Sequence, residues 1–347
     1  MPKDIVAGKI NLSTIARIPE QMAVALARHV LSPGNIVFPR RGEINKCAFV
    51  TEREQGFLCG TGCLKIEVDN SIVEPKFLFF FLGLPSSAAW LEKHAVGSTM
   101  LNLNTGILGE IEVPLPPLSE QRRIVGILSA YDDLIENNRK RIALLEESAR
   151  SLYKEWFVRL RFPGHERVPV EDGVPKGWKR ATVGDVCEVL YGKAHADIPD
   201  GDIPIVGSGG VMRKGDKALC TESSVLIPRK GSLGNVMLME EPFWVVDTMF
   251  YTRMKHPNTV RWLYYSIQDM KLEERATGTA IPSMTTAILN PLPLRLPSAE
   301  VLSKFSDWTN PLFSQIKTLR RESEKLAAAR DALLPRLFNS TMQKVKK

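Results

Sequence analysis

The chain has 347 residues, of which 44% are hydrophobic and 24% are charged, and this balance excludes a generally disordered protein. A chain of this length has room for about two domains with their own cores. Its net charge of +7 favours a polyanionic partner, most simply nucleic acid.

Membrane and secretory classes are not supported by the sequence. The most apolar run, residues 78–84, is far shorter than the roughly 20 residues that a membrane helix needs. The N-terminus shows no apolar core or cleavage site of a signal peptide. Five cysteines, an odd number, do not suggest a disulfide framework. We therefore expect a cytoplasmic protein with no membrane partner.

In the first part of the chain, short β-branched and apolar runs predict a β-rich unit that extends to residue 117. Strands are expected at 36–38, 47–50 and 64–68, followed by helices near 75–82 and 87–94. A long helix over 118–158 comes next, after a proline-rich stop and a serine cap at Ser119. Its apolar positions recur every seven residues, and Asn138 lies in the companion row, where it can fix the register of a coiled coil.

Residues 159–176 are rich in proline, glycine and charge and predict a linker. A second β-rich unit follows over 177–297, with strands at 186–191, 224–227, 236–239 and 244–246 and a helix over 259–274. A second long helix, 298–340, carries an unbroken heptad row from Phe305 to Leu333.

The two halves of the chain repeat one another. Gly97-Ser98-Thr99 and Gly278-Thr279-Ala280 are 181 residues apart (278 − 97 = 181), and the two long helices keep this offset. The basic pairs before Gly42 and Gly231 match at a slightly larger offset. Solenoid repeats have periods of about 20–50 residues, so this spacing indicates a duplicated domain. Two diverged copies suggest that a ligand is read in two halves.

These patterns predict an α+β fold. We expect two β-rich units in a pseudo-two-fold arrangement, separated by two long antiparallel coiled-coil helices. The second unit opens with Pro175-Lys176-Gly177-Trp178 and Val183-Gly184-Asp185, for which no counterpart precedes Met1. The first unit is therefore expected to be truncated at its N-terminal end.

Specific motifs resemble a known family. The motifs are Pro-Leu-Pro-Pro-Leu-Ser-Glu-Gln-Arg-Arg-Ile-Val at 114–125, the end of the first long helix at 144–157, the opening 175–185 and the loop 97–104. With them the whole chain resembles the specificity subunit of type I restriction–modification systems.

The resemblance implies two target recognition domains, each of which reads one half of a split DNA sequence, and helices that set the gap. It implies a non-catalytic subunit that recruits methyltransferase subunits, expected to be two, and through them the translocating endonuclease subunit. The assembled complex would be an adenine-specific DNA methyltransferase and endonuclease. The missing opening of the first domain departs from the family's pattern.

Two pairs of segments are candidate DNA-binding sites. Paired cations on a loop after a strand suit phosphate clamping or guanine recognition, and small hydroxyl and amide side chains on a glycine loop can approach DNA closely. A solvated loop and a plain turn are the alternative readings. The candidates are Arg40, Arg41, Lys46, Ser98, Thr99, Asn102 and Asn104 in the first copy and Arg229, Lys230, Ser232, Asn235, Thr277, Thr279 and Ser283 in the second.

Other motifs favour no cofactor, no metal and no catalytic site. Residues 203–210 imitate a dinucleotide fingerprint, but Met212 stands where its third glycine belongs, so a turn is the better interpretation. Cys59 and Cys63 lack a second ligand pair at zinc spacing. No phosphate-binding loop or methyltransferase motif occurs. A scaffold that reads one half-site, or a DNA nuclease with duplicated binding units, remains an alternative function.

Overall fold

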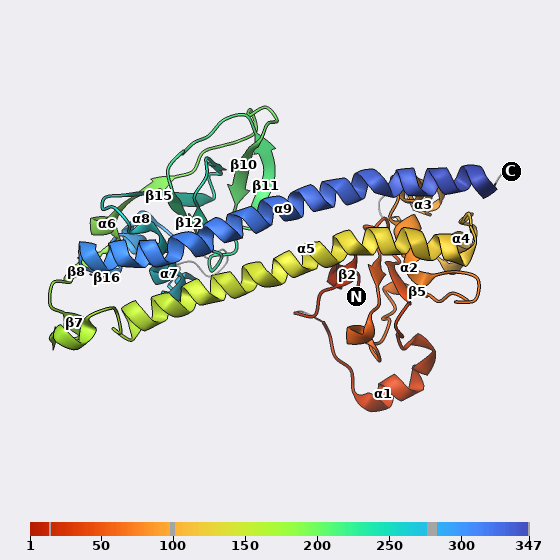
Figure 1. Cartoon of the computed structure of the whole chain (residues 1–347), viewed down its shortest axis with the longest axis horizontal. Helices are drawn as coiled ribbons and strands as arrows, with labels where there is room; N and C mark the ends of the chain where they lie inside the picture. The colour runs from red at the N-terminus through yellow and green to blue at the C-terminus, as the bar shows by residue number, and fades with distance from the viewer. Residues whose placement is uncertain (14, 98–100, 276–282, 346–347) are drawn as a thin grey trace. The chain divides into compact units, whose positions relative to one another are not determined.

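The computed structural model describes residues 1–13, 15–97, 101–275 and 283–345, with side chains to residue 339. The chain divides into two compact units. Unit 1 comprises Met1–Arg139 and Arg320–Lys347, and unit 2 comprises Lys140–Leu319. Figure 1 draws the two long helices that contribute residues to both units, α5 in yellow and α9 in blue. None of the helices in the described part of the chain is long and apolar enough to span a membrane.

Unit 2 combines short strands with helices, as an α+β fold requires. Its strands are β6 (Val170–Glu171), β7 (Val174–Pro175), β8 (Lys179–Thr182), β9 (Cys187–Tyr191), β10 (Ile203–Gly207), β11 (Gly210–Gly215), β12 (Ser224–Pro228), β13 (Met237–Met239), β14 (Trp244–Val245), β15 (Met249–Met254) and β16 (Pro293–Leu296). Its helices are α6 (Val183–Val186), α7 (Val260–Asp269) and α8 (Thr286–Leu289).

The main sheet of unit 2 has the order β13-β12-β15-β9, with antiparallel neighbours throughout. All five residues of β12 are buried, which explains why residues 225–228 are a continuous apolar run rather than an alternating one. Helix α7 buries Trp262 in the same core cluster as Val225 and Phe250 of the sheet. The helix expected over 259–274 ends at Asp269, because Lys271 adopts a left-handed conformation that breaks the helix.

Unit 1 repeats this plan on a smaller scale. Its strands are β1 (Ile5–Val6), β2 (Lys9–Ile10), β3 (Ile36–Pro39), β4 (Ala48–Phe49) and β5 (Cys63–Ile66), and its helices are α1 (Glu20–Ala25), α2 (Pro75–Leu82), α3 (Pro85–His94) and α4 (Thr105–Gly109). The sheet has the order β4-β3-β5, and Val37 pairs with Ala48 as Leu226 pairs with Met237 in unit 2. Leu226 lies 189 residues after Val37 (226 − 37 = 189), and Met237 lies 189 residues after Ala48. Because Arg229 follows Arg40 at the same offset, the equivalent strand pairing supports the duplication.

The two sheets differ at one edge. In unit 2, β9 pairs with the outer side of β15, and β8 pairs with β16. In the described part of unit 1, no strand occupies the matching edge of β5, and residues 111–117 form no strand. A short hairpin, β1–β2, lies beside β4 instead, where the Phe49 amide donates to the Gly8 carbonyl at 3.1 Å.

The two long helices predicted from heptads are present. Helix α5 spans Leu118–Tyr153 and α9 spans Ala299–Val345. Within unit 1, Phe338 shares a core cluster with Ile124 and Leu128, and Arg330 pairs with Asp132 at 2.6 Å. Higher residue numbers of α9 thus meet lower numbers of α5, so the two segments run antiparallel in this unit.

Residues 159–176, expected as a linker, lie within unit 2. After α5 the chain makes one π-helical turn, Lys154–Val158, which buries Trp156 and Phe157. The Phe157 ring lies 4.9 Å from that of Phe305 in α9, and the Phe162 ring lies 5.2 Å from that of Trp178. Within this segment, β6 and β7 form a short hairpin whose turn places Asp172 and Gly173 at positive φ.

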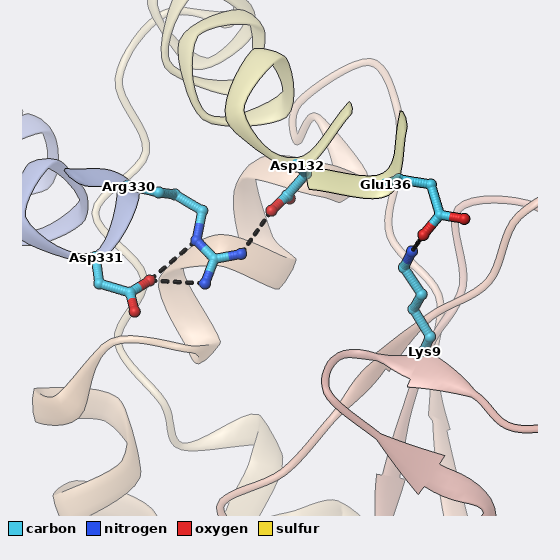
Figure 2. A network of polar contacts seen from close by, with 5 residues as sticks. All are labelled: Lys9, Asp132, Glu136, Arg330 and Asp331. Atoms are coloured by element: carbon cyan, nitrogen blue, oxygen red, sulfur yellow. Dashed lines mark hydrogen bonds and ion pairs between the residues drawn. The ribbon is translucent and has the colours of Figure 1, made fainter. Parts of the chain in front are cut away.

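A polar network ties three elements of unit 1 together (Figure 2). Lys9 of β2 pairs with Glu136 of α5 at 2.6 Å, and Arg139 pairs with the same carboxylate at 3.1 Å. Arg330 of α9 bonds Asp132 of α5 as well as its neighbour Asp331. The hydrogen bond from Lys9, with help from Arg139, lowers the pKa of Glu136 to about 2.

We expect Lys9→Met to destabilise unit 1 in a pH-dependent way. The depressed pKa of Glu136 means that the folded state binds fewer protons than the unfolded state below about pH 4.5. The stabilisation is complete above that pH and is lost as the pH falls towards 2. The substitution should therefore lower the free energy of unfolding by about 1 kcal/mol at pH 7 and much less near pH 2. Urea unfolding across this range measures it, with Lys3→Met, an exposed lysine, as the control. An equal effect at every pH would contradict the assignment.

Candidate nucleic-acid interface

The basic loop of unit 2 follows directly from the buried strand β12. The amide of Arg229 donates to the Thr248 carbonyl at 2.8 Å, and the carbonyl of Arg229 accepts from the Met284 amide at 2.9 Å. Gly231 has a φ of +80°, which favours glycine, and turns the chain so that Leu233 is buried. The loop is thus fixed at both ends by main-chain bonds and by one apolar anchor.

The basic loop of unit 1 has the same frame. It follows β3, the carbonyl of Arg40 accepts from the Leu103 amide at 2.8 Å, and Gly42 has a φ of +84°. Ile44, which is buried, takes the place of Leu233. The turn bonds also match, since the Ile44 amide donates to Gly42 at 2.8 Å and the Leu233 amide donates to Gly231 at 2.9 Å.

These bonds bring together the two kinds of segment that the sequence singles out. In unit 1, Arg41 forms an isolated antiparallel bridge with Asn102, and the Gly42 amide donates to the Leu101 carbonyl at 3.2 Å. In unit 2, the bond between Arg229 and Met284 joins the basic loop to the residue after Ser283. The described residues therefore bond the cationic loop to residues 101–103 in unit 1 and to Met284 in unit 2.

The cations of unit 1 that are candidates for DNA binding are accessible. Arg40, Arg41 and Lys46 are exposed, and Arg41 and Lys46 line a small depression together with Lys3 and Glu43. Lys46 pairs with Glu43 at 2.7 Å. Three cations against one carboxylate leave a local positive charge, which suits a phosphate group.

The two cations of the basic loop of unit 2, Arg229 and Lys230, differ in accessibility. The guanidinium of Arg229 lies 4.7 Å from the ring centre of Tyr191 and 5.3 Å from that of Phe250, and it donates to the Asp247 carbonyl at 2.7 Å. Its Nε is buried without a hydrogen-bond partner. Lys230, by contrast, is exposed. Arg229 therefore braces the loop, and Lys230 carries its accessible charge.

The comparisons with known proteins agree with a duplicated DNA-reading unit. The family model for the type I restriction modification DNA specificity domain matches this chain twice, over residues 30–147 and 175–326, which is more than half of its length. The chain belongs to this family.

Named relatives cover most of this specificity chain. It is 25% identical over 350 residues to the type I restriction enzyme MjaIX specificity subunit of Methanocaldococcus jannaschii, with 92% of this chain and 80% of the relative covered. It is 21% identical to the HindI specificity subunit of Haemophilus influenzae, with 95% and 90% covered. The crystal structure of a type I S subunit from M. genitalium matches its fold with a TM-score of 0.53 at 18% identity, over 88% of this chain and 83% of that one. The chain is a DNA sequence-recognition subunit and not an enzyme.

The remaining candidate residues of the specificity subunit have mixed settings. Asn104 caps α4, since its side-chain oxygen accepts from the Ile107 amide at 2.9 Å. Asn102 has a buried side-chain oxygen without a partner. Ser232 is exposed and Ser283 is half-buried, and Asn235 donates to the Ser208 carbonyl at 2.8 Å. Ser98, Thr99, Thr277 and Thr279 lie outside the described residues.

Sequence reasoning missed two features of this interface. The stacking of Arg229 on Tyr191 joins positions far apart in the chain, and no local pattern indicates it. Residues 203–210, interpreted as a turn, contain the strand β10 of the hairpin β10–β11, and only the glycine cluster at 207–210 makes the turn itself. Strands were not predicted here, because the segment contains Pro204 and several glycines and both residue types are rare in strands.

The cysteine motif has a packing role in unit 1. Cys59 and Cys63 are buried beside Val37 and Ala48. Burial raises the pKa of the Cys59 thiol to about 11, so the thiol stays protonated at neutral pH. In the part of the chain that the structure describes, no group of three histidine, cysteine or acidic residues is placed to hold a metal ion.

Proposed function

We propose that this subunit reads a bipartite double-stranded DNA target, with one half-site bound by each unit. The observation that carries the proposal is the repetition of one loop frame. Both units hold a basic loop between a buried strand and a small polar segment by the same main-chain bonds. A protein that reads one continuous site has no need of two such frames.

The proposal includes the rest of the complex. Two methyltransferase subunits bind the specificity subunit, and the endonuclease subunit joins through them, which makes the assembly an adenine-specific methyltransferase and endonuclease. Family membership supports this composition, and the names of the relatives refer to subunits of type I restriction enzymes. The DNA of a bacterial or archaeal cell lies in the cytoplasm, so the subunit acts there. No cofactor is assigned to the chain itself.

The accessible cations provide the test. We expect Lys230→Ala to reduce the slope of log affinity against log salt by about 0.9, the contribution of one neutralised phosphate. Arg41→Ala should do the same in unit 1. The measurement is DNA binding by the reconstituted complex between low and physiological salt.

Arg229→Ala is the matched comparison for Lys230→Ala. Because Arg229 braces the loop against Tyr191 and Phe250, we expect its loss to lower the melting temperature of unit 2 and to leave the salt slope nearly unchanged. If neither Lys230→Ala nor Arg41→Ala changed the slope, these loops would not lie on the DNA face.

One observation favours a second candidate, a scaffold that reads a single half-site through unit 2. The described sheet of unit 1 has three strands where unit 2 has four. Selection of bound sequences from a randomised duplex distinguishes the two, because a single-half-site scaffold would enrich only one block of bases. The third alternative, a nuclease, requires metal-dependent cleavage of DNA by the purified chain.

A further inference from the structure

Among the described residues, the hairpin β10–β11 is the one strand pair whose register is interrupted by a β-bulge. Its strands are antiparallel, and β10 also pairs in parallel with β14, so β11 forms the outer edge of this small sheet. Figure 1 draws the two strands as adjacent green arrows at the edge of unit 2. Ile205 and Val206 of β10 are buried, which anchors this strand in the core next to the turn.

Met212 is the bulged residue of this hairpin. Ile205 pairs with Arg213 and Val206 pairs with Val211, so Met212 is the extra residue without a partner on β10. Bulges bend a strand and redirect a side chain, and they are common beside functional sites. Met212 is 58% exposed and Val211 is 62% exposed, so two apolar side chains stand next to each other in solvent.

The Met212 side chain lies against the turn of the hairpin. Its sulfur would lie 2.7 Å from a Cβ at Gly207, so the side chain is in contact with this glycine. The next residue, Arg213, donates to the carbonyls of His195 at 2.6 Å and Ile198 at 2.9 Å. The backbone on the far side of the bulge is therefore held in place.

The turn of this hairpin is joined to the basic loop of unit 2. The Asn235 side-chain nitrogen donates to the Ser208 carbonyl at 2.8 Å. A Cβ at Gly231 would lie 2.7 Å from the Ser208 hydroxyl, so the two turns are in close contact. The exposed Lys230 precedes this contact point. The exposed apolar side chain of Met212 and the exposed cation Lys230 thus belong to two turns that contact each other.

We propose that Met212 is a specificity-determining residue that contacts the C5-methyl group of a thymine in the half-site of unit 2. The methyl group is the apolar feature of base edges in the major groove, and a two-stranded ribbon is one of the elements that fit into this groove. Lys230 binds the adjacent backbone and holds the ribbon in register. This inference rests on the proposed function and adds which element reads a base.

The experiment uses the reconstituted methyltransferase complex and its selected target. Each thymine of the second half-site is replaced singly by 2′-deoxyuridine, which pairs identically but lacks the methyl group. For the wild-type complex we expect one such replacement to weaken binding about fourfold, the effect of removing one buried methyl group. Met212→Ala should weaken binding to the natural target and abolish the difference between thymine and uracil at that position alone.

Two controls separate contact from folding. Met212→Leu keeps an apolar side chain and should retain part of the methyl sensitivity. Leu144→Ala removes another exposed apolar side chain of unit 2, from α5, and should behave as wild type. The salt slope should be unchanged in Met212→Ala, because no charge is lost.

Three outcomes would overturn the inference. The first is a wild-type complex that tolerates uracil at every position of the second half-site, or a half-site without thymine on either strand. The second is a Met212→Ala complex that keeps the methyl sensitivity. The third is weaker assembly with the methyltransferase subunits and unchanged base preference, which would identify the hairpin as a protein contact. A wild-type complex without any sequence preference would refute the proposed function itself.

Discussion

Lengthening α5 and α9 by four residues each is expected to widen the gap between the two DNA half-sites by one or two base pairs. Four helical residues add about 6 Å, at 1.5 Å per residue, and one base pair rises about 3.4 Å. The bases of each half-site should stay the same, because neither β-rich part of the chain is altered. Methylation mapping of the reconstituted complex reads out both properties.

The points of insertion follow from the structure. Both helices contribute to both units, so both must be lengthened, after Arg139 in α5 and after Leu319 in α9, where the units divide. An insertion after Leu152 would instead displace Tyr153, Trp156 and Phe157 from the core of unit 2. A four-residue insertion does not complete a heptad and therefore introduces a stutter into the coiled coil. Inserting the residues into both helices at matching positions confines the stutter to one place along the helix pair. An unchanged gap with full activity would show that the helices do not set the spacing.

Phe338→Ala is expected to destabilise unit 1 by about 3–5 kcal/mol, the usual cost of removing a large buried aromatic side chain. Phe338 is 1% exposed, and its ring centre lies 4.8 Å from that of Phe77 and 5.9 Å from that of Phe81. It joins the C-terminal part of α9 to α2. A cavity at this position removes contacts with both the helix α2 and the core around Ile124.

Hydrogen exchange measured by mass spectrometry tests this prediction, because it reports on the two units separately. Peptides of unit 1 should exchange faster in Phe338→Ala, and peptides of unit 2 should keep their protection. Trp308→Ala is the control on the same helix, since Trp308 is 60% exposed and its loss should cost at most about 1 kcal/mol. Equal exchange in Phe338→Ala and wild type would show that α9 does not complete the core of unit 1.

The sequence predicted the elements whose signal is local and repeated. Helices α5 and α9 follow from heptad rows that continue over five repeats, and β12 follows from an apolar run bounded by turns. The equivalence of the basic loops followed from the offset between Arg40 and Arg229 alone. The structure adds that both loops share their turn geometry, which residue types could only suggest.

Features that depend on tertiary contacts could not be predicted. Lys9 meets Glu136 across 127 positions of the chain, and Arg229 stacks on Tyr191 from a different strand. The packing of Phe162 against Trp178 turns a composition typical of linkers into an ordered segment. Lys271 ends its helix through a left-handed conformation that a lysine rarely adopts, so helix propensity did not predict where this helix ends. For the ion pair, the stacked arginine and the Phe162 segment, a partner distant in the sequence rather than the local sequence decides the conformation.

The central claim is that one chain reads two half-sites through two copies of one unit. Selection from a fully randomised duplex library by the reconstituted complex, followed by sequencing of the bound DNA, tests it most directly. We expect two short blocks of enriched bases separated by a gap of constant length without base preference. Lys230→Ala should weaken enrichment of the whole target, whereas Met212→Ala should relax one position in one block. A single enriched block, or none, would contradict the account.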